Sequence, residues 1–210
     1  TYDERLSFGP TEIYEFNGAF FVRKDSIEIA KVLIPKDVAD TDGDGNLELL
    51  VSVNDSTWIL EQQNSNAFPG EIRFTDFDQE HFPSQFADTD GDGEVELVTK
   101  NFKDYLIYER SGDTWNESAT LADDSPNYQG SVAPRSLVGD FDGDGKIETV
   151  FGDFDGDLIV YEHQGGENYS LSFLDTTTLN KSASYLTAGD YDGDGQQEIF
   201  VAIHTSLLRN

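Results

Sequence analysis

One nine-residue acidic pattern, D-x-D-G-D-G-x-x-E, occurs four times in this chain of 210 residues. The copies span Asp40–Glu48, Asp88–Glu96, Asp140–Glu148 and Asp190–Glu198, and their first aspartates are 48, 52 and 50 residues apart. A strict motif that recurs at a period near 50 residues is typical of a repeat architecture, in which each repeat is one unit that packs against its neighbours. The repeat therefore limits the possible folds more than any other feature of the sequence.

The chemistry of each copy indicates calcium. Ca²⁺ takes about six to eight oxygen ligands at loose geometry, and carboxylates at positions 1, 3 and 5 of a tight loop supply them. The glycine at position 6 permits the sharp turn, and the backbone carbonyl at position 7 is a ligand that any side chain allows. We predict as ligands Asp40, Asp42, Asp44, Asn46 and Glu48; Asp88, Asp90, Asp92, Glu94 and Glu96; Asp140, Asp142, Asp144, Lys146 and Glu148; Asp190, Asp192, Asp194, Gln196 and Glu198.

The loop is similar to an EF-hand only over its first six positions. Its last acid stands at position 9 rather than 12, and apolar, strand-like residues follow it. We therefore expect it between β-strands. The alternative is a solvated hairpin turn, since Asp-Gly favours turns, but four copies that keep every carboxylate favour a metal. Magnesium suits the pattern less because it tends to keep its waters. A fifth acidic stretch, Asp153–Asp157, lacks the position-6 glycine and the final acid, and we interpret it as a turn.

Composition limits the partners. Acidic residues outnumber basic ones by 42 to 13, so the formal net charge is −29, and four Ca²⁺ ions with eight positive charges would bring it to −21. This charge argues against nucleic acid and anionic lipid as partners, because binding phosphate requires a basic face. No apolar run has membrane-spanning length, so no membrane insertion is expected. Weak calcium sites suit the millimolar calcium outside cells, which favours an extracellular location.

The repeat is expected to contain four short antiparallel strands. In the third copy these strands are predicted at Ser136–Gly139, Ile147–Phe151, Leu158–Glu162 and Tyr169–Leu174. Four strands in about 50 residues are typical of a β-propeller blade, and no segment has the pattern of a long amphipathic helix. The sequence predicts an all-β fold, a propeller of four-stranded antiparallel blades, as a single domain over residues 1–210.

The repeats extend over about 34–81, 82–133, 134–183 and 184–210, preceded by N-terminal strands within 1–33. The last repeat supplies two strands, and Glu12–Phe16 and Ala19–Arg23 are similar to third and fourth strands. We expect four blades, the last of them shared between the N- and C-termini, since closure removes open sheet edges. The alternatives are a fragment of a larger propeller of about seven blades, or chains that complete each other's blades.

These loops, each followed by an apolar strand, resemble the FG-GAP/VCBS repeat. That family forms calcium-loop β-propellers, among them the integrin α-subunit head, some lectins and many secreted bacterial proteins. The resemblance covers nearly the whole chain and implies one calcium ion for each blade that carries the motif, about four ions here. It implies no single function, because the fold hosts lectins, adhesins and non-catalytic modules attached to enzymes.

No catalytic residue is predicted. The three histidines, His81, His163 and His204, lie at different points of the repeat, and the chain has no cysteine and no G-x-S-x-G motif. Among the aromatic residues, Trp115 in a polar stretch is the best candidate for an exposed binding residue.

We therefore expect a non-catalytic extracellular module with structural calcium, used for adhesion or for binding a glycan or an extracellular protein. Self-association is a further option. One alternative is a structural subunit of an extracellular fibre or surface layer, assembled by blade sharing or calcium bridging. A less favoured alternative is a polysaccharide hydrolase or lyase on a propeller scaffold.

Overall fold

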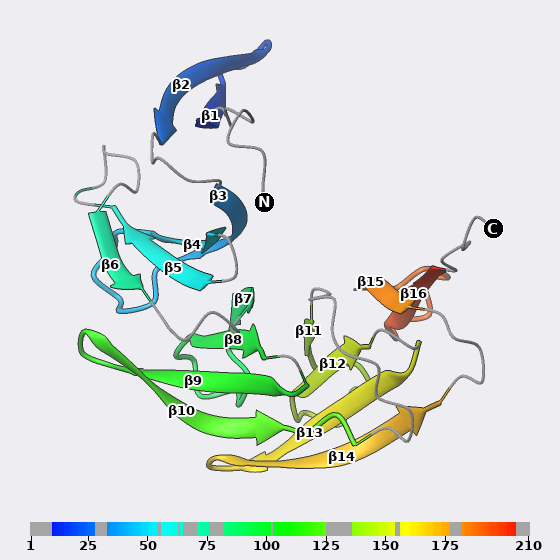
Figure 1. The fold of residues 1–210 in the computed structure, drawn as a ribbon. Helices are drawn as coiled ribbons and strands as arrows, with labels where there is room; N and C mark the ends of the chain where they lie inside the picture. Colours follow the sequence, from blue (N-terminus) through cyan, green and yellow to red (C-terminus); the bar gives the residue numbers. More distant parts are fainter. Residues whose placement is uncertain are drawn as a thin grey trace, which may run out of the picture.

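The computed structural model describes residues 10–27, 33–53, 56–62, 64, 71–75, 82–101, 103–124, 136–153, 156–176 and 182–204. All the regular elements in these residues are β-strands, arranged in five antiparallel sheets along an open arc (Figure 1). The three complete sheets contain β3 (Leu33–Ala39), β4 (Glu48–Val53), β5 (Ser56–Glu61) and β6 (Glu71–Thr75); β7 (Phe82–Ala87), β8 (Glu96–Lys100), β9 (Tyr105–Ser111) and β10 (Thr114–Leu121); and β11 (Leu137–Gly139), β12 (Glu148–Gly152), β13 (Leu158–Gly165) and β14 (Asn168–Asp175).

Each complete sheet is a propeller blade. Its strands pair in chain order, with the first strand on the inner side of the arc and the fourth on the outer side (Figure 1). The predicted all-β propeller fold is confirmed, and the four strands predicted in the third repeat agree with β11 to β14 to within a few residues. We refer to the sheets β3–β6, β7–β10 and β11–β14 as the first, second and third blades.

The blades pack through apolar side chains that alternate along their strands. On β9, Tyr105 and Ile107 lie in a buried cluster with Phe151 of the third blade, whereas Leu106 and Tyr108 lie in a cluster with the first blade. Successive side chains of a strand point to opposite faces of its sheet. A continuous apolar run in β9 therefore covers both faces of a blade that lies between two neighbours.

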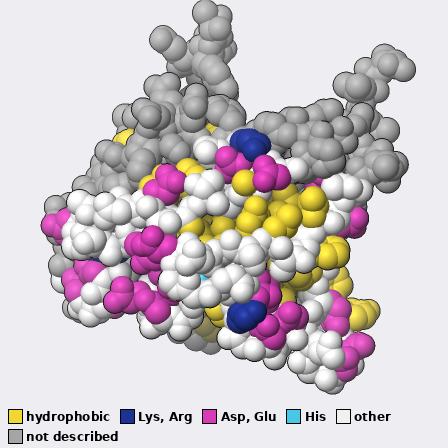
Figure 2. Space-filling model, turned by 90° about the horizontal axis from the view of Figure 1, so that it is seen from below, with side chains coloured by type: hydrophobic (Ala, Val, Ile, Leu, Met, Phe, Trp, Pro, Cys, Tyr) yellow, Lys and Arg dark blue, Asp and Glu magenta, His cyan; other side chains and the backbone are white. Residues whose placement is uncertain are grey.

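The surface is strongly acidic, as the composition predicts. On the face shown in Figure 2, acidic side chains are spread widely around an apolar centre, and basic side chains are few. The described ends of the fifth acidic stretch are hydrogen-bonded to each other as a turn requires, and residues 154–155 lie outside the described residues. The Asp153 carboxylate accepts hydrogen bonds from the backbone N–H groups of Gly156 and Asp157, at 2.8 Å each, between the end of β12 and the start of β13.

The predicted shared blade does not form in the described part of the chain, and this expectation is corrected. The strands β1 (Thr11–Phe16) and β2 (Phe21–Ile27) form one two-stranded sheet, and β15 (Ser182–Gly189) and β16 (Glu198–His204) form another. The two sheets lie at opposite ends of the arc (Figure 1). Each terminal sheet packs against the blade that is next to it in the chain. Ile13 and Ile27 pack on the first blade, and β15 packs beside β12 of the third blade.

A buried lysine lies between the second and third blades. Lys100, the last residue of β8, is fully buried, and its Nζ lies 4.6 Å from the centroid of the Tyr105 ring and 5.8 Å from that of Phe151. This Nζ has no hydrogen-bond partner. The buried carboxylates of Asp123 and Asp153 interact with it electrostatically.

Candidate metal centres

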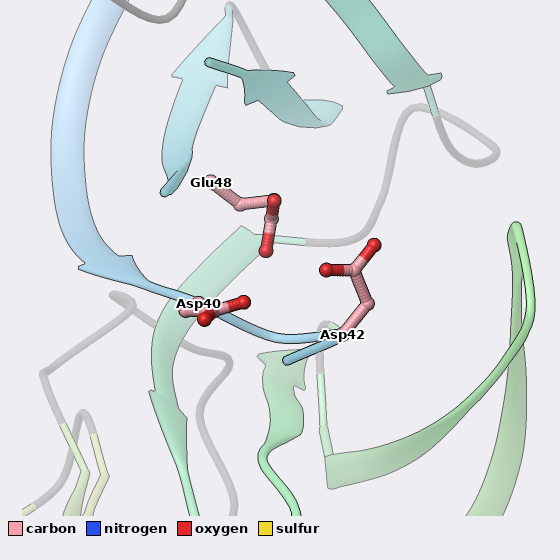
Figure 3. A group of neighbouring side chains, drawn as sticks. All are labelled: Asp40, Asp42 and Glu48. Atoms are coloured by element: carbon pink, nitrogen blue, oxygen red, sulfur yellow. The ribbon is translucent and has the colours of Figure 1, made fainter. Parts of the chain in front are cut away.

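The four acidic loops occupy equivalent places in the fold. Each joins a first strand to a second strand: β3 to β4, β7 to β8, β11 to β12 and β15 to β16. The acid at position 9 is in every case the first residue of the second strand. The strand backbone therefore fixes this carboxylate, and the turn brings the position-1 and position-3 carboxylates towards it. Figure 3 shows this convergence for Asp40, Asp42 and Glu48.

One network of backbone hydrogen bonds turns the carboxylates inward. In the first loop Asp40 accepts from the N–H groups of Gly43 and Gly45, at 2.8 and 2.9 Å. Asp42 accepts from the N–H of Asp44, at 3.1 Å, and Asp44 accepts from the N–H of position 7. The other three loops repeat these bonds. Gly43 and Gly45 have φ of 73° and 87°, a region that favours glycine, so both glycines are needed.

In the first and third loops the acid at position 9 carries a buried oxygen that has no hydrogen-bond partner. One oxygen of Glu48, Oε2, accepts from the backbone N–H and from Oγ1 of Thr41, at 2.6 and 2.7 Å. The other, Oε1, is buried without a hydrogen-bond partner, and Oε1 of Glu148 is in the same situation. A buried carboxylate oxygen with no partner is costly. A cation in the loop would satisfy it.

The electrostatics of the loops also favour a cation. Burial raises the pKa of Glu48, and it raises the pKa of Glu96 to about 7. Burial raises the pKa of Glu148 as well. Desolvation and neighbouring carboxylates both disfavour the charged form, whereas a bound divalent ion would reverse this preference. A ligand set made only of oxygens suits a hard cation such as Ca²⁺.

The structure brings together some of the predicted ligands of each loop and leaves others apart. In the first three loops, oxygens of positions 1, 3 and 9 lie within 4.8 Å of one another, and in the fourth loop those of positions 1, 3 and 5 do. The groups are Asp40, Asp42 and Glu48; Asp88, Asp90 and Glu96; Asp140, Asp142 and Glu148; and Asp190, Asp192 and Asp194. The position-5 residues Asp44, Asp92 and Asp144, and Glu198 of the fourth loop, lie outside these groups.

The position-7 residues donate their backbone N–H to position 5, and ligation by their carbonyls stays a prediction. Lys146 differs from the other three because its Nζ lies 3.4 Å from Asp144 Oδ2 and also contacts Glu162. Asp142, Asp144 and Glu162 form a second acidic group at this loop. The lysine provides a positive charge beside that group.

Arg110, which sequence reasoning missed, reaches the first loop from the neighbouring blade. Its Nη2 lies 2.8 Å from Asp42 Oδ2, its Nη1 lies 3.5 Å from Glu48 Oε2, and Nη1 also donates to Thr41 Oγ1. The guanidinium lines an open cavity of about 400 Å³ between the first and second loops. The only available signal was a basic residue directly after the acid of a third strand, as in Glu109–Arg110.

Replacing Arg110 by glutamine is expected to lower the thermal stability of the calcium-free protein. It should also increase the stability that the protein gains when calcium binds to the first loop. The change removes charged hydrogen bonds worth about 1.5–3 kcal/mol, so the melting temperature in chelator should fall by about 3–12 °C. It also removes a positive charge that repels the ion. Thermal unfolding in chelator and in calcium measures both effects, with Arg23→Gln, at an exposed ion pair with Glu12, as the control. Equal losses in chelator and in calcium would contradict the proposed competition.

Other side chains considered for binding or catalysis have structural contacts. The expectation that Trp115 is exposed is wrong: its ring stacks on Phe86, with centroids 6.1 Å apart, and packs against the cluster between the first two blades. Nε2 of His163 lies 2.6 Å from the Gly166 carbonyl oxygen, and its ring contacts Tyr169. His81 and the side chain of His204 lie outside the described residues.

These blades, each with an acidic loop between its first and second strands, define a β-propeller of acidic-loop repeats. The chain belongs to the FG-GAP-like repeat family, whose model matches residues 40–99 and 140–201, more than half of the sequence. The resemblance inferred from the loops is thereby confirmed. No curated protein matches the chain. In the described residues, no helix has the length and apolar character needed to cross a membrane.

Two solved structures are similar to this chain. The V. cholerae biofilm matrix protein Bap1 is 23% identical, with a TM-score of 0.49, over 81% of this chain and 29% of that protein. The Bacillus licheniformis rhamnogalacturonan lyase PL11 is 18% identical, with a TM-score of 0.45, over 80% of this chain and 40% of the lyase. The chain thus spans less than half the length of either protein.

Proposed function

We propose that this chain is a calcium-stabilised β-propeller module that acts outside the cell in adhesion, by binding a glycan or a protein. The observation that carries the calcium part is the buried Oε1 of Glu48 and of Glu148, which has no hydrogen-bond partner and lies in a loop rich in carboxylates. Four ions, one for each loop, would convert binding energy into folding energy. The calcium concentration outside cells, in the millimolar range at which weak oxygen-ligand sites fill, suits loops of this kind and supports an extracellular location.

The position of the loops supports a structural role for the ions. Each loop joins two strands, and side chains of the next blade contact the first two loops: Arg110 reaches the first, and Tyr169 Oη lies 2.8 Å from Thr89 Oγ1 in the second. An ion that orders a loop would therefore also order the contact between two blades. Calcium is proposed to hold the arc together rather than to act on a substrate.

Replacing Asp42 or Asp142 by asparagine tests the calcium sites. Titration calorimetry should give about four ions for the unmodified chain, the number that the four loops predict. Each substitution should remove about one ion and lower the melting temperature in calcium by about 5–10 °C, the loss of one site's stabilisation. Asp113→Asn, in the exposed turn between β9 and β10, is the matched control. Unchanged stoichiometry and melting temperature in both variants would refute a structural calcium role.

The binding part of the proposal has a candidate surface. The cavity between the first two loops is lined by acidic residues, by Val95 and by the cation of Arg110, a mixed set that suits a polar ligand such as a glycan. A glycan and protein binding screen in calcium, repeated with Arg110→Gln, tests this surface. We propose no catalytic activity for the module, and turnover on a panel of polysaccharides would overturn that point.

The alternative of a structural subunit is favoured by one specific observation. Both terminal sheets are two-stranded, with strand edges that no other described strand covers. Such edges are templates for pairing with another chain.

A further inference from the structure

The two terminal hairpins have the geometry of complementary halves of one blade. In the first blade the pairing of third and fourth strands shifts register between Ile59 and Leu60, and in the third blade between Val160 and Tyr161. In β1–β2 the shift falls between Ile13 and Tyr14. The three shifts fall at equivalent positions of the repeat. Each lies between the residues two and one before an equivalent acid, which is Glu61, Glu162 or Glu15. The hairpin β1–β2 is therefore the outer half of a blade.

The hairpin β15–β16 is the inner half. It carries the fourth acidic loop between its strands, and Glu198 begins β16 as Glu48 begins β4. In a complete blade the second strand pairs with the third, so β16 has the edge that β1 would occupy. In the described part of the chain, neither strand has a partner on that edge.

Both halves expose apolar side chains that blades normally cover. On the N-terminal hairpin Phe16 is 54% exposed and Phe21 69% exposed, and on β16 Phe200 is 43% exposed. The fourth loop is also open, since its position-2 residue Tyr191 is 81% exposed whereas Thr89 in the second loop is fully buried. An open apolar sheet edge beside an uncovered loop marks an interaction surface.

We propose that β16 of one copy pairs with β1 of a second copy, so that two chains build one four-stranded blade, head to tail. This deepens the proposed function, on which it rests, by naming a second copy as a partner. The same chain is disfavoured as the source of β1, because β1–β2 packs on the first blade, at the other end of the arc from β16 (Figure 1). A heterologous contact of this kind propagates into a chain of subunits unless the ring closes.

The complete blades specify the register of the new pair. Glu48 lies opposite Glu61, and Glu148 lies opposite Glu162. By the same rule Glu198 should lie opposite Glu15, and Ala202 opposite Thr11. The N–H of Gln62 donates to the Leu47 carbonyl at 3.0 Å, and His163 donates to Ile147 at 2.9 Å. The acid pair is thus a non-hydrogen-bonded pair, and so is every second pair along the strands, including that of Thr11 with Ala202.

This register allows a direct cross-linking test, because the chain contains no cysteine. The two single variants Thr11→Cys and Ala202→Cys are mixed in millimolar calcium under mild oxidation. Non-hydrogen-bonded pairs bring Cβ atoms within reach of a disulfide, so most of the protein should become a covalent heterodimer. The double variant should form a ladder of multimers. Neither position is a predicted calcium ligand.

The matched control shifts the register by one residue. Thr11→Cys mixed with Val201→Cys should not cross-link, because adjacent residues of a strand point to opposite faces. Chelator should suppress the heterodimer, since the ion at the fourth loop offsets the charge of Glu198 facing Glu15. Light scattering of the unmodified protein at the same concentration should give masses above that of one chain.

The outcomes separate this inference from the proposed function. A double variant that gives only an internally cross-linked monomer would mean that the chain closes on itself, and this would overturn the proposal. Equal cross-linking at Thr11 with Ala202 and with Val201, or no cross-link and a monomeric mass, would also overturn it. If calcium stoichiometry stays near four in such a result, the calcium role stands; if no calcium binds, the proposed function fails instead.

Discussion

Removal of calcium with a chelator is expected to lower the melting temperature of the protein by more than about 10 °C. One site filled at about 100 times its dissociation constant stabilises the folded state by about 2.7 kcal/mol, and a domain of this size changes by about 2–4 °C per kcal/mol. Four such sites would order the loops that connect first and second strands, and two of these loops also carry contacts between blades. Thermal unfolding followed by circular dichroism, with and without millimolar calcium, measures the change. Magnesium at the same concentration is the control and should restore less.

The pH dependence of stability should have opposite signs in chelator and in millimolar calcium. Without calcium, burial raises the pKa of Glu96 from 4.5 to about 7, so the folded state binds this proton more tightly than the unfolded state. The stabilisation of the folded state by this proton is complete below about pH 4.5 and is lost as the pH rises to about 7. With calcium bound, protons compete with the ion for the same carboxylates, so stability falls as the pH is lowered.

Glu96→Gln separates the effect of the proton on Glu96 from the effect of bound calcium. The amide imitates the protonated acid, so in chelator near pH 7.5 the variant should be more stable than the unmodified chain, and in calcium it should be less stable because one site is damaged. Melting temperatures from pH 4.5 to 7.5 in both conditions test this. Stability that rises with pH in chelator as well as in calcium would contradict the proposed source of the effect.

The local parts of this structure could be predicted from the sequence because local rules decide them. The strands of the third repeat follow from apolar runs bounded by turn residues, and the acidic loop has the carboxylate spacing of a calcium site. The first glycine of each loop, at position 4, was not assigned a role. Its positive φ, 73° at Gly43, follows from the hydrogen bonds that Asp40 accepts, and these appear only in three dimensions.

The contacts between blades could not be predicted, because they depend on which surfaces meet. Trp115 has polar sequence neighbours, Thr114 and Asn116, yet it is the inward residue of an outer strand whose adjacent residues face solvent. Arg110 lies on β9 but serves a loop of the preceding blade, 62 to 70 residues away in the chain. The prediction of a blade shared between the two termini was wrong for the same reason. The strand pattern shows whether a hairpin is the inner or the outer half of a blade, but it does not show which other hairpin pairs with it.

The buried lysine provides the second large effect. Replacing Lys100 by methionine keeps much of the side-chain volume but removes the positive charge that offsets Asp123 and Asp153, which are 0% and 2% exposed. Removing one member of a buried charged group costs about 3–5 kcal/mol, because the remaining charge stays buried. The melting temperature should therefore fall by about 6–20 °C, measured by thermal unfolding at pH 7. The interface between the second and third blades should be the region that loosens, which hydrogen exchange of β8 and β12 would report.

Lys103→Met is the matched control, because this lysine is exposed and its ion pairs with Asp104 and Asp124 lie at the surface. Exposed pairs contribute about 0–1 kcal/mol, so the control should change the melting temperature by less than about 4 °C. Equal losses in the two variants would mean that the lysine acts through packing of its alkyl chain rather than through its charge.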